Sequence, residues 1–255
     1  KYACMVYRAY CYLTMVELWG DMPFVTKAPG DMSDIYIPRT SKDQIITSLI
    51  NDLTEAEKSL PDDGDYMICS KYLASALLAN AYLQKKDYSN VLTYTSKIIG
   101  SVRYNLCTNL NDAFNPSNKE TLFSFLANEG DDPDFNELIR KGQETPMVRY
   151  AGILLTAAEA SLQQNSLSEA IQFVNQVRGR NNRTLLSGSA TKNDIESSIL
   201  EEWGKDLAKE GCYFNALKRF GVAESVLQIP AYMTLLPIPQ RELDVNPNIA
   251  QNPGY

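Results

Sequence analysis

The chain has 255 residues, of which 44% are hydrophobic and 22% are charged, a composition that excludes an intrinsically disordered protein. Its formal net charge is −7 and it has no cluster of basic residues, which argues against binding to nucleic-acid phosphates. No apolar run approaches the roughly 20 residues that a membrane-spanning helix needs.

Histidine is absent from the sequence. Its absence removes the side chain that titrates near neutral pH, and with it the usual Ser/His and Cys/His nucleophile systems and most catalytic zinc sites. No glycine-rich phosphate-binding loop is present either. We therefore expect a protein that is not an enzyme, with no catalytic residues, no metal site and no cofactor.

The cysteines are few, scattered and odd in number. Cys4 and Cys11 would lie about 10 Å apart along one helix, which is too far for a disulfide. None has the spacing of a metal-ligand set. We predict free, buried thiols at all five positions: Cys4, Cys11, Cys69, Cys107 and Cys212.

The first predicted helix covers residues 2–20. It is apolar on nearly all sides, so we expect it to be buried between neighbouring helices. The sequence Gly20-Asp21-Met22-Pro23 ends it. The chain opens inside this helix at Lys1 without an initiator methionine, and we interpret it as a fragment or a processed chain. A loop that contains Tyr36 follows.

Two further helices are predicted before residue 85. Ser41 and Gln44 have the spacing of a capping box, and apolar residues follow at helical intervals until Pro61. Ser70 can cap the next helix, which leads through a polar turn into a partner helix that stops at Gly100. Small residues recur along the helix after Ser70 and would let another helix approach closely: Ala74, Ala76, Ala79 and Ala81.

A second copy of this helix–turn–helix unit lies 79 residues further on. The shift aligns apolar positions in both helices, among them Leu83 with Leu162, Leu92 with Ile171 and Ile98 with Val177. The spacing resembles a tetratricopeptide unit. We predict one all-α domain over 1–255, a curved stack of tetratricopeptide-like helix pairs at about 2–60, 70–100, 147–178 and 191–220.

The segment 191–220 carries the last predicted pair. Ile195, Ile199, Trp203 and Leu207 form one apolar stripe, and Gly211 can take the left-handed conformation that ends a helix. Carboxylates on one face could serve acid–base chemistry, but we interpret them as a solvated or ion-paired face: Glu202, Asp206 and Glu210.

The C-terminal segment 228–255 is rich in proline. Proline removes backbone donors and fixes φ, so we predict a tail that is not helical and runs extended or in turns. Apolar residues such as Leu235, Leu236 and Ile238 are interleaved with these prolines, which a polar linker would not require. We expect the tail to be strapped onto the helical body.

Both C-terminal segments carry a family resemblance. L235-L-P-I-P-Q-R-E-L-D-V-N-P-N-I-A-Q-N-P-G-Y255 resembles the signature L-P-I-P-x-x-E-x-D-x-N-P-N-x-x-Q-N-P-G-Y of the SusD/RagB family. Residues 202–221 resemble the family's E-x-x-x-E-L-A-x-E-G-x-R-x-x-D-L-x-R-W-G. They depart from it at Tyr213, where the family often has Arg, and at Ala216, where it often has Asp.

Earlier motifs support the same resemblance over about 2–126 and 145–255. They are R8-A-Y-x-Y-x-x-x-V-E-L-W-G-D-M-P-F-V25, R149-Y-A-G-I-L-L-T-A-A-E-A160 and N175-Q-V-R-G-R180. Gly152 stands where the family usually has Glu. The acidic stretch between the two matched regions lacks the spacing of a calcium loop and replaces a longer insertion of the family: Asp131, Asp132 and Asp134.

The resemblance implies a SusD-like, non-enzymatic nutrient-binding protein of the cell surface. Such proteins are outward-facing lipoproteins of the outer membrane, held by an N-terminal lipid anchor that this sequence does not contain. They bind glycan oligosaccharides and deliver them to a SusC-like TonB-dependent transporter. Two alternatives remain open: a helical-repeat scaffold for protein–protein interaction without sugar binding, and a hydrolase that acts on the same glycans.

The aromatic residues include the candidate ligand contacts. Fifteen tyrosines suit a surface that stacks on sugar rings and offers hydroxyl groups for hydrogen bonds. Tyrosines at helical core spacing are interpreted as packing residues: Tyr10, Tyr72, Tyr82 and Tyr94. Three loop aromatics remain as predicted ligand-binding residues, namely Tyr36, Tyr66 and Phe135. The sequence does not identify the glycan.

Overall fold

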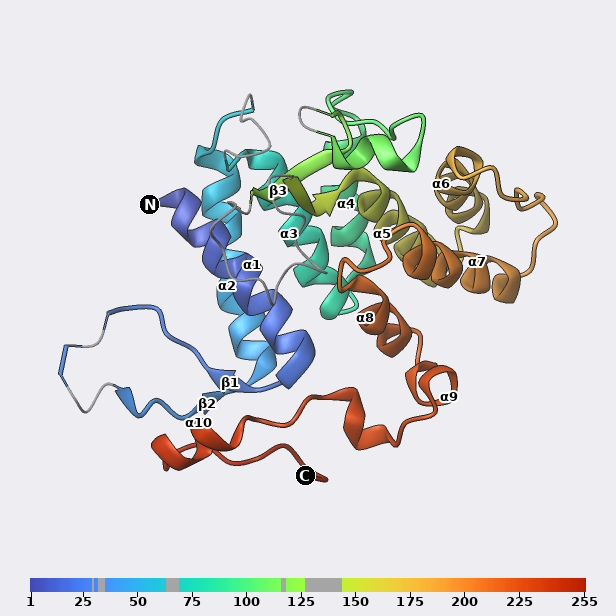
Figure 1. Cartoon of the computed structure of the whole chain (residues 1–255). Helices are drawn as coiled ribbons and strands as arrows, with labels where there is room; N and C mark the ends of the chain where they lie inside the picture. Colours follow the sequence, from blue (N-terminus) through green and yellow to red (C-terminus); the bar gives the residue numbers. More distant parts are fainter. Residues whose placement is uncertain (29, 32–34, 63–68, 116–117, 127–143) are drawn as a thin grey trace.

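The computed structural model describes residues 1–28, 30–31, 35–62, 69–115, 118–126 and 144–255 (Figure 1). This part of the chain is mostly helical, and its strands form two short antiparallel pairs. The prediction of an all-α fold is therefore confirmed. None of the helices described is both long and apolar enough to cross a membrane.

The helices follow one another as antiparallel neighbours, each packed on the one before (Figure 1). The helices α3 (Lys71–Gln84) and α5 (Tyr150–Gln163) have equal lengths and are offset by 79 residues at both ends, as the predicted repeat requires. The other helices of the stack are α1 (Tyr2–Trp19), α2 (Lys42–Ser59), α4 (Tyr88–Ile99), α6 (Leu167–Arg180), α7 (Lys192–Lys205) and α8 (Cys212–Arg219).

Side-chain caps start several of these helices where the sequence predicts. The Ser41 hydroxyl accepts a hydrogen bond from the backbone N–H of Gln44, and Ser70 caps α3 in the same way. Thr191 and Asp194 form a complete capping box at the start of α7, which was not predicted. Gly211 has the left-handed φ expected of it, 76°, but it does not end α7, which stops at Lys205; it stands just before α8.

Two apolar clusters form the core. One joins α1, α2 and α3, and its fully buried members include Ile45, Leu49 and Leu78. The other joins α5, α6 and α7 and includes Leu154, Val174 and Ile199. Amphipathic helices of this kind are stable only when a neighbour covers the apolar face, so the two clusters hold the stack together.

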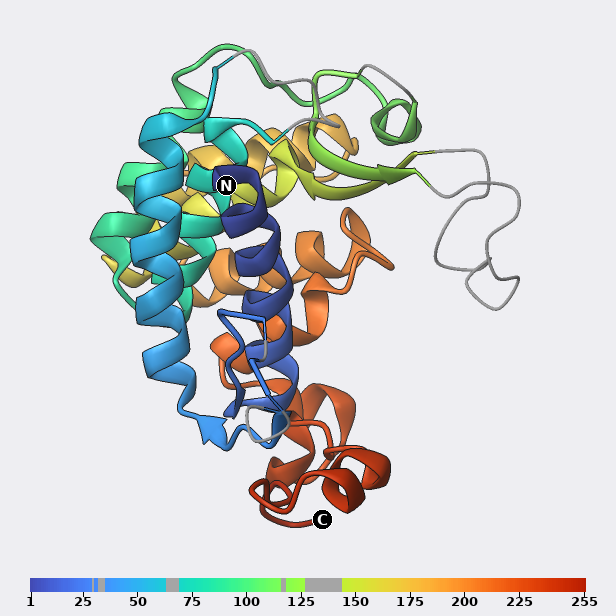
Figure 2. The ribbon, with the colours of Figure 1, turned by 90° about the vertical axis from the view of Figure 1, so that its left-hand side faces the viewer.

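A β-hairpin lies across one end of the stack (Figure 2). Its antiparallel strands are β3 (Thr121–Leu126) and β4 (Glu144–Arg149), and a smaller pair joins β1 (Met22–Pro23) to β2 (Arg39–Thr40). The hairpin was not predicted, and the helix expected from residue 147 begins only at Tyr150. Pairing with β3 holds residues 145–149 extended, which suits the β-branched Thr145 and Val148 and the helix-breaking Pro146.

One side of α1 is exposed, contrary to the prediction that this helix is buried on all sides. The exposed stripe contains Cys4, Tyr7 and Cys11. The helix packs on α2 and α3, and its buried residues, which include Val6, Ala9 and Leu13, lie away from this stripe. All five cysteines are free, as predicted. The prediction of buried thiols is confirmed for Cys69, but it was wrong for the exposed Cys4 and Cys11, and Cys107 and Cys212 are only half-buried.

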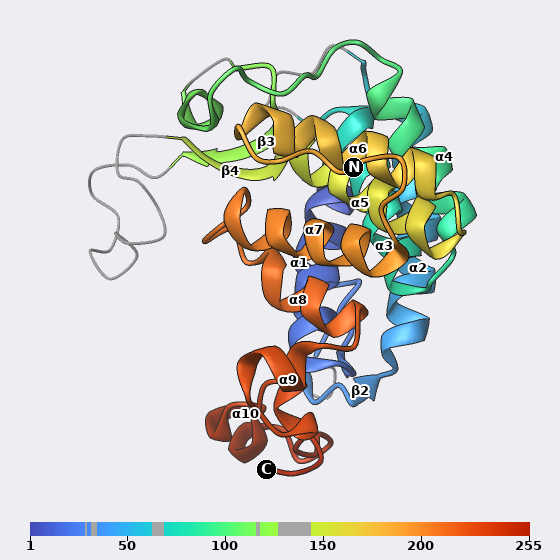
Figure 3. The same cartoon turned by 90° about the vertical axis from the view of Figure 1, so that its right-hand side faces the viewer.

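The C-terminal tail lies beside the end of α1 and the β1–β2 pair (Figures 1 and 3). After α8 the chain forms α9 (Ala223–Leu227), the short 3-10 helix η4 (Ala231–Thr234) and α10 (Gln240–Val245). The prediction that the tail contains no helix was wrong for α10. Pro239 directly precedes that helix with a φ of −54°, where its fixed φ suits a helix start and no N–H is needed.

Backbone hydrogen bonds attach the tail to α1. The N–H of Leu236 donates to the carbonyl of Leu18 at 2.8 Å. The indole N–H of Trp19 donates to the carbonyl of Pro237 at 3.1 Å. The tail thereby covers polar groups at the C-terminal end of α1 that would otherwise be satisfied by water.

Candidate functional site

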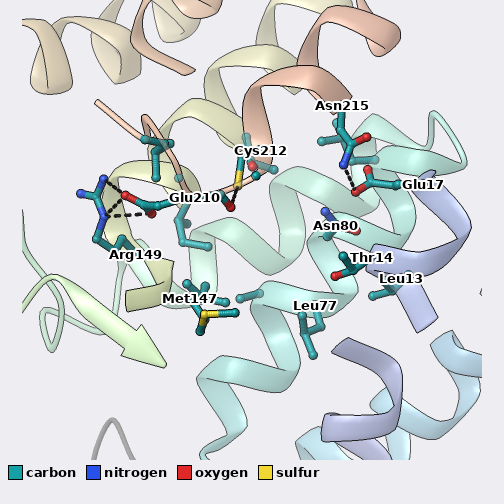
Figure 4. A pocket seen from close by; sticks show the side chains of 18 of the residues that line it. Leu13, Thr14, Glu17, Leu77, Asn80, Met147, Arg149, Glu210, Cys212 and Asn215 are labelled. Atoms are coloured by element: carbon teal, nitrogen blue, oxygen red, sulfur yellow. Dashed lines mark hydrogen bonds and ion pairs between the residues drawn. The ribbon is translucent and has the colours of Figure 1, made fainter. Parts of the chain in front are cut away.

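A partly open cavity of about 180 Å³ lies where α1, α3, α5 and the segment 203–219 meet (Figure 4). The helix α1 contributes Tyr10 and Glu17, α3 contributes Leu77 and Asn80, and α5 begins beside it. These elements belong to different helix pairs, so the cavity exists only when the stack is assembled.

Apolar side chains form most of the wall. They include Leu13, Leu77, Ile153 and Leu207, together with the ring of Trp203. Such a wall suits the apolar face of a ligand, because burying that face removes apolar surface from water.

Gly152 leaves space in this wall. A Cβ atom added there would meet Leu207 Cδ1 at 3.9 Å and Trp203 Cη2 at 4.0 Å, which are ordinary van der Waals contacts. The position could therefore carry a side chain, and such a side chain would reach toward the cavity that Gly152 lines.

Two buried polar atoms at the cavity lack a hydrogen-bond partner within the described part of the chain. They are Nε1 of Trp203 and Oδ1 of Asn215, and each residue is only 6% exposed. Leaving such a group unpaired costs about 1–3 kcal/mol. Each of the two atoms has less than 1 Å² of accessible surface, so neither is open to a ligand in the cavity. One atom is a donor and the other is an acceptor.

An ion pair closes one end of the cavity (Figure 4). Arg149 donates from Nη2 to Glu210 Oε1 at 2.7 Å and from Nε to Glu210 Oε2 at 3.1 Å. Burial raises the pKa of Glu210, and the positive charge of Arg149 opposes that shift. The same guanidinium donates to Glu120 at 2.5 Å and to Asp206 at 3.2 Å.

A larger buried network continues from Arg149 behind this end of the cavity. Arg180 bonds both Glu120 and Asp206, and Glu202 accepts hydrogen bonds from Arg178 and Arg183. The prediction of an ion-paired carboxylate face is confirmed. Glu202 and Asp206 are buried, however, at 0% and 2% exposure, so the alternative of a solvated face was wrong.

Charged side chains also line the opposite end. Asn215 Nδ2 donates to Glu17 Oε2 at 2.8 Å, and Arg219 donates to both carboxylate oxygens of Glu159 at 2.8 and 2.9 Å. Burial raises the pKa of Glu17 and lowers the pKa of nearby Lys218 to about 8. Lys218 donates to the backbone carbonyl of Glu17.

The two carboxylates that line the cavity are thus already engaged. Glu210 is bound by a bidentate Arg149, while Glu17 accepts from Asn215 and lies 3.7 Å from Arg219. Glycoside hydrolysis needs one free acid and one free base or nucleophile across the scissile bond. The described residues of the cavity hold no such free pair.

The predicted ligand residues are not brought together at this cavity. Tyr36 lies between β1 and β2, is 40% exposed, and its carbonyl accepts a hydrogen bond from Asn248 at 2.7 Å. It does not line the cavity. Tyr66 and Phe135 lie outside the described residues, as do Asp131, Asp132 and Asp134. No cluster suited to a metal ion occurs in the described ranges.

Sequence reasoning missed the residues that do line the cavity. The rings of Tyr82 and Tyr94 stack with their centroids 5.7 Å apart, as expected of packing residues. Tyr10 was also expected to be a packing residue, but it lines the cavity. Trp203 and Asn215 were placed on helices without a role. One hint of the cavity was present in the sequence. Gly152 lines the cavity, and it stands at a position where the family usually has Glu.

Comparison with known proteins agrees with the fold. Residues 88–233 match the SusD family, and residues 1–83 match a family described as "Starch-binding associating with outer membrane". SusD-like protein P25 of Formosa agariphila is 29% identical over 183 residues, 65% of this chain and 34% of that protein. The chain thus matches about a third of the length of this curated relative.

Solved structures of low sequence identity share the architecture. A SusD superfamily protein from Bacteroides vulgatus has a TM-score of 0.87 at 17% identity, over 100% of this chain and 77% of that one. A laminarin-binding SusD-like protein has a TM-score of 0.82 at 19% identity, over 100% and 78%. With the SusD match over more than half of its residues, the chain belongs to the SusD family.

Proposed function

We propose that this chain binds glycans and does not cleave them. Support comes from its family, from the laminarin-binding structural neighbour, and from the cavity. The central observation is a largely apolar cavity wall whose two carboxylates already have partners. Glu210 is bound by Arg149 and Glu17 accepts from Asn215, so neither carboxylate is free for acid–base chemistry.

A sugar ring suits this combination. Its C–H face can pack on the apolar wall, and its hydroxyl groups can meet the neutral polar side chains that also line the cavity, Thr14, Asn80 and Thr156. Binding of this kind needs a preformed site and no proton transfer. Tyr36, Tyr66 and Phe135 remain proposed contacts for further sugar units of a longer chain.

The cellular setting is part of the proposal. The name of the family matched by residues 1–83 supports a place at the outer membrane. We propose an outward-facing lipoprotein, held by an N-terminal lipid anchor, that passes oligosaccharides to a SusC-like TonB-dependent transporter. Residues 1–255 would act as one domain of that protein.

Affinity electrophoresis in gels containing a panel of polysaccharides tests glycan binding. At least one neutral polysaccharide should retard the protein, and a reducing-sugar assay on the same polysaccharide should show no turnover. If none of the glycans retards the chain and a pull-down recovers a protein partner, the interaction-scaffold alternative is correct. Turnover in the reducing-sugar assay would support a hydrolase.

A further inference from the structure

We infer that the cavity binds a neutral aromatic ring that the glycan carries as a substituent, in an aryl glycoside or an aromatic acyl ester. This assignment rests on the proposed function and adds the chemical class of glycan that the site prefers. The ring enters the cavity, and the sugar that carries it stays at the mouth.

The inner part of the cavity wall is apolar. Its apolar side chains are at most 6% exposed, and they come from α1, α3, α5, α7 and the turn after α7: Leu13, Ala76, Leu77, Leu83, Ile153, Trp203 and Leu207. The one polar atom among these side chains, Trp203 Nε1, has less than 1 Å² of accessible surface. A sugar ring enclosed by them would lose hydrogen bonds to water without replacing them, whereas an aromatic ring has none to lose.

The volume fits one aromatic ring. A protein cavity of about 150 Å³ admits benzene. At about 180 Å³, this cavity has room for one such ring and little more, and it is only partly enclosed. The ring of Trp203 in the wall can make an offset or edge-to-face contact with an aromatic ligand.

Neutral polar side chains lie where the wall reaches solvent. Thr14 is exposed, and Tyr10 and Asn80 are half-buried. Thr14 and Asn80 lie at the end of the cavity away from Arg149 and Glu210 (Figure 4). Their hydroxyl and amide groups can bond to the hydroxyl groups of a sugar. An amphipathic ligand, with its ring inside and its sugar at the mouth, therefore matches both parts of the wall.

The ring must be neutral. Four ionic side chains line the cavity, and each has an ionic partner: Glu17, Arg149, Glu210 and Arg219. A charged ring would be stripped of water and would find no free counter-charge among them.

Pairs of ligands that differ only in the ring provide the first test. Isothermal calorimetry compares phenyl with methyl glycosides of D-glucose and D-galactose, and the benzoyl with the acetyl ester of D-glucose. At least one aromatic ligand should bind about tenfold or more tightly than its partner without the ring, because the cavity removes the ring from water. Phenyl glycosides and benzoyl esters distinguish the two linkages. Benzyl alcohol should compete, and a para-carboxyphenyl glucoside should bind no better than the methyl glucoside.

Substitution locates the bound ring. Gly152→Leu adds apolar atoms to the wall, where a Cβ would meet Leu207 and Trp203 at ordinary contact distances, and should abolish the preference for aromatic ligands. Gly188→Leu is the matched control, since nothing lies within 4 Å of a Cβ at that position. Phe125→Ser removes a ring that is 50% exposed and lies outside the cavity, so the preference should persist in this variant. Thermal unfolding shows whether each variant is folded.

Three results would overturn the inference: no aromatic ligand binds more tightly than its partner, the preference persists in folded Gly152→Leu, or Phe125→Ser abolishes it. The first and third need no cavity variant, so they decide the matter even if Gly152→Leu does not fold. Retardation by polysaccharides without a preference for aromatic ligands would refute the aromatic site and leave the proposed function standing. Loss of both would refute both.

Discussion

The side-chain N–H of Asn252 donates to the carbonyl of Trp19 at 3.0 Å, although 233 residues separate them in the sequence. The same amide donates to the carbonyl of Leu236 at 2.8 Å, and its oxygen accepts from Arg39 at 2.6 Å. Asn252 is 3% exposed. One buried amide thus joins the end of α1, the strand β2 and the tail.

Replacing this amide should loosen the tail. Asn252→Ala leaves buried partners unpaired, and each unpaired group costs about 1–3 kcal/mol, so urea unfolding should show a marked loss of stability. Limited proteolysis should also cut the variant's tail faster. Asn248→Ala, which removes an exposed bond to Tyr36, is the control and should change little. Equal behaviour of the two variants would contradict the role assigned to Asn252.

The buried ion network gives a second prediction. Arg149→Met leaves the carboxylates of Glu120 and Asp206 buried with one partner fewer, and breaking a buried pair costs about 3–5 kcal/mol. Denaturant unfolding should show this loss.

Lys205→Met is the matched control for that substitution. Lys205 is 58% exposed and pairs with Glu201 one helical turn away, an interaction worth about 0.5 kcal/mol or less. If Arg149→Met were no more destabilising than Lys205→Met, the network would not stabilise the junction of β4 and the turn after α7.

Thiol labelling tests the burial of the cysteines. Burial raises the pKa of Cys69 to about 11 and that of Cys212 to about 12, so neither forms the reactive thiolate readily at pH 8. Cys4 and Cys11 are exposed on α1. A disulfide reagent should modify these two thiols first, the half-buried Cys107 and Cys212 more slowly, and the buried Cys69 only after unfolding.

The double variant Cys4→Ser/Cys11→Ser serves as the control for labelling. Its labelling reaction should lack the fast phase that belongs to Cys4 and Cys11 and keep the slower labelling of the other thiols. A fast phase that survives unchanged in this variant would mean that the fast-reacting thiols are not Cys4 and Cys11.

Acid titration tests Glu201. Hydrogen bonds from Lys205 and Arg178 lower the pKa of Glu201 from 4.5 to about 2. Between pH 4.5 and about pH 2, Glu201 binds a proton in the unfolded chain but not in the folded chain. The stability that ionised Glu201 contributes is therefore complete above pH 4.5 and is lost as the pH falls toward 2.

The melting temperature of Glu201→Gln should therefore fall less than that of the parent between pH 5 and about pH 3, because the variant has no carboxylate to protonate in this range. Glu224→Gln, an exposed substitution outside the described ion pairs, should follow the parent. Identical pH profiles for Glu201→Gln and the parent would show that the shift does not contribute to stability.

Local sequence rules predicted the helices well and the contacts between distant segments poorly. Capping at Ser41 and Ser70 depends on neighbours in the chain, and the repeat offset can be seen in the sequence itself; the structure agrees with both. The hairpin depends on pairing between residues 121–126 and 144–149, which neither a capping signal nor a helical period reveals.

The cavity could not have been predicted from local pattern. It is formed by α1, α3, β4, α5, α7, α8 and the turn between α7 and α8, and a helical periodicity cannot say which residues of separate elements face the same space. Trp203 lies on α7 as predicted, whereas Leu207 follows the end of that helix at Lys205; both line the cavity wall. The family departure at Gly152 was visible in the sequence, but its effect on volume depends on its distances from those two side chains.

Equilibrium dialysis against end-labelled neutral oligosaccharides, with chromatography of the retained sugar, tests the central claim most directly. The account predicts that the protein compartment concentrates at least one oligosaccharide and that the sugar recovered from it has its original length. Equal concentrations on both sides for every oligosaccharide, or recovery of shortened products, would contradict it.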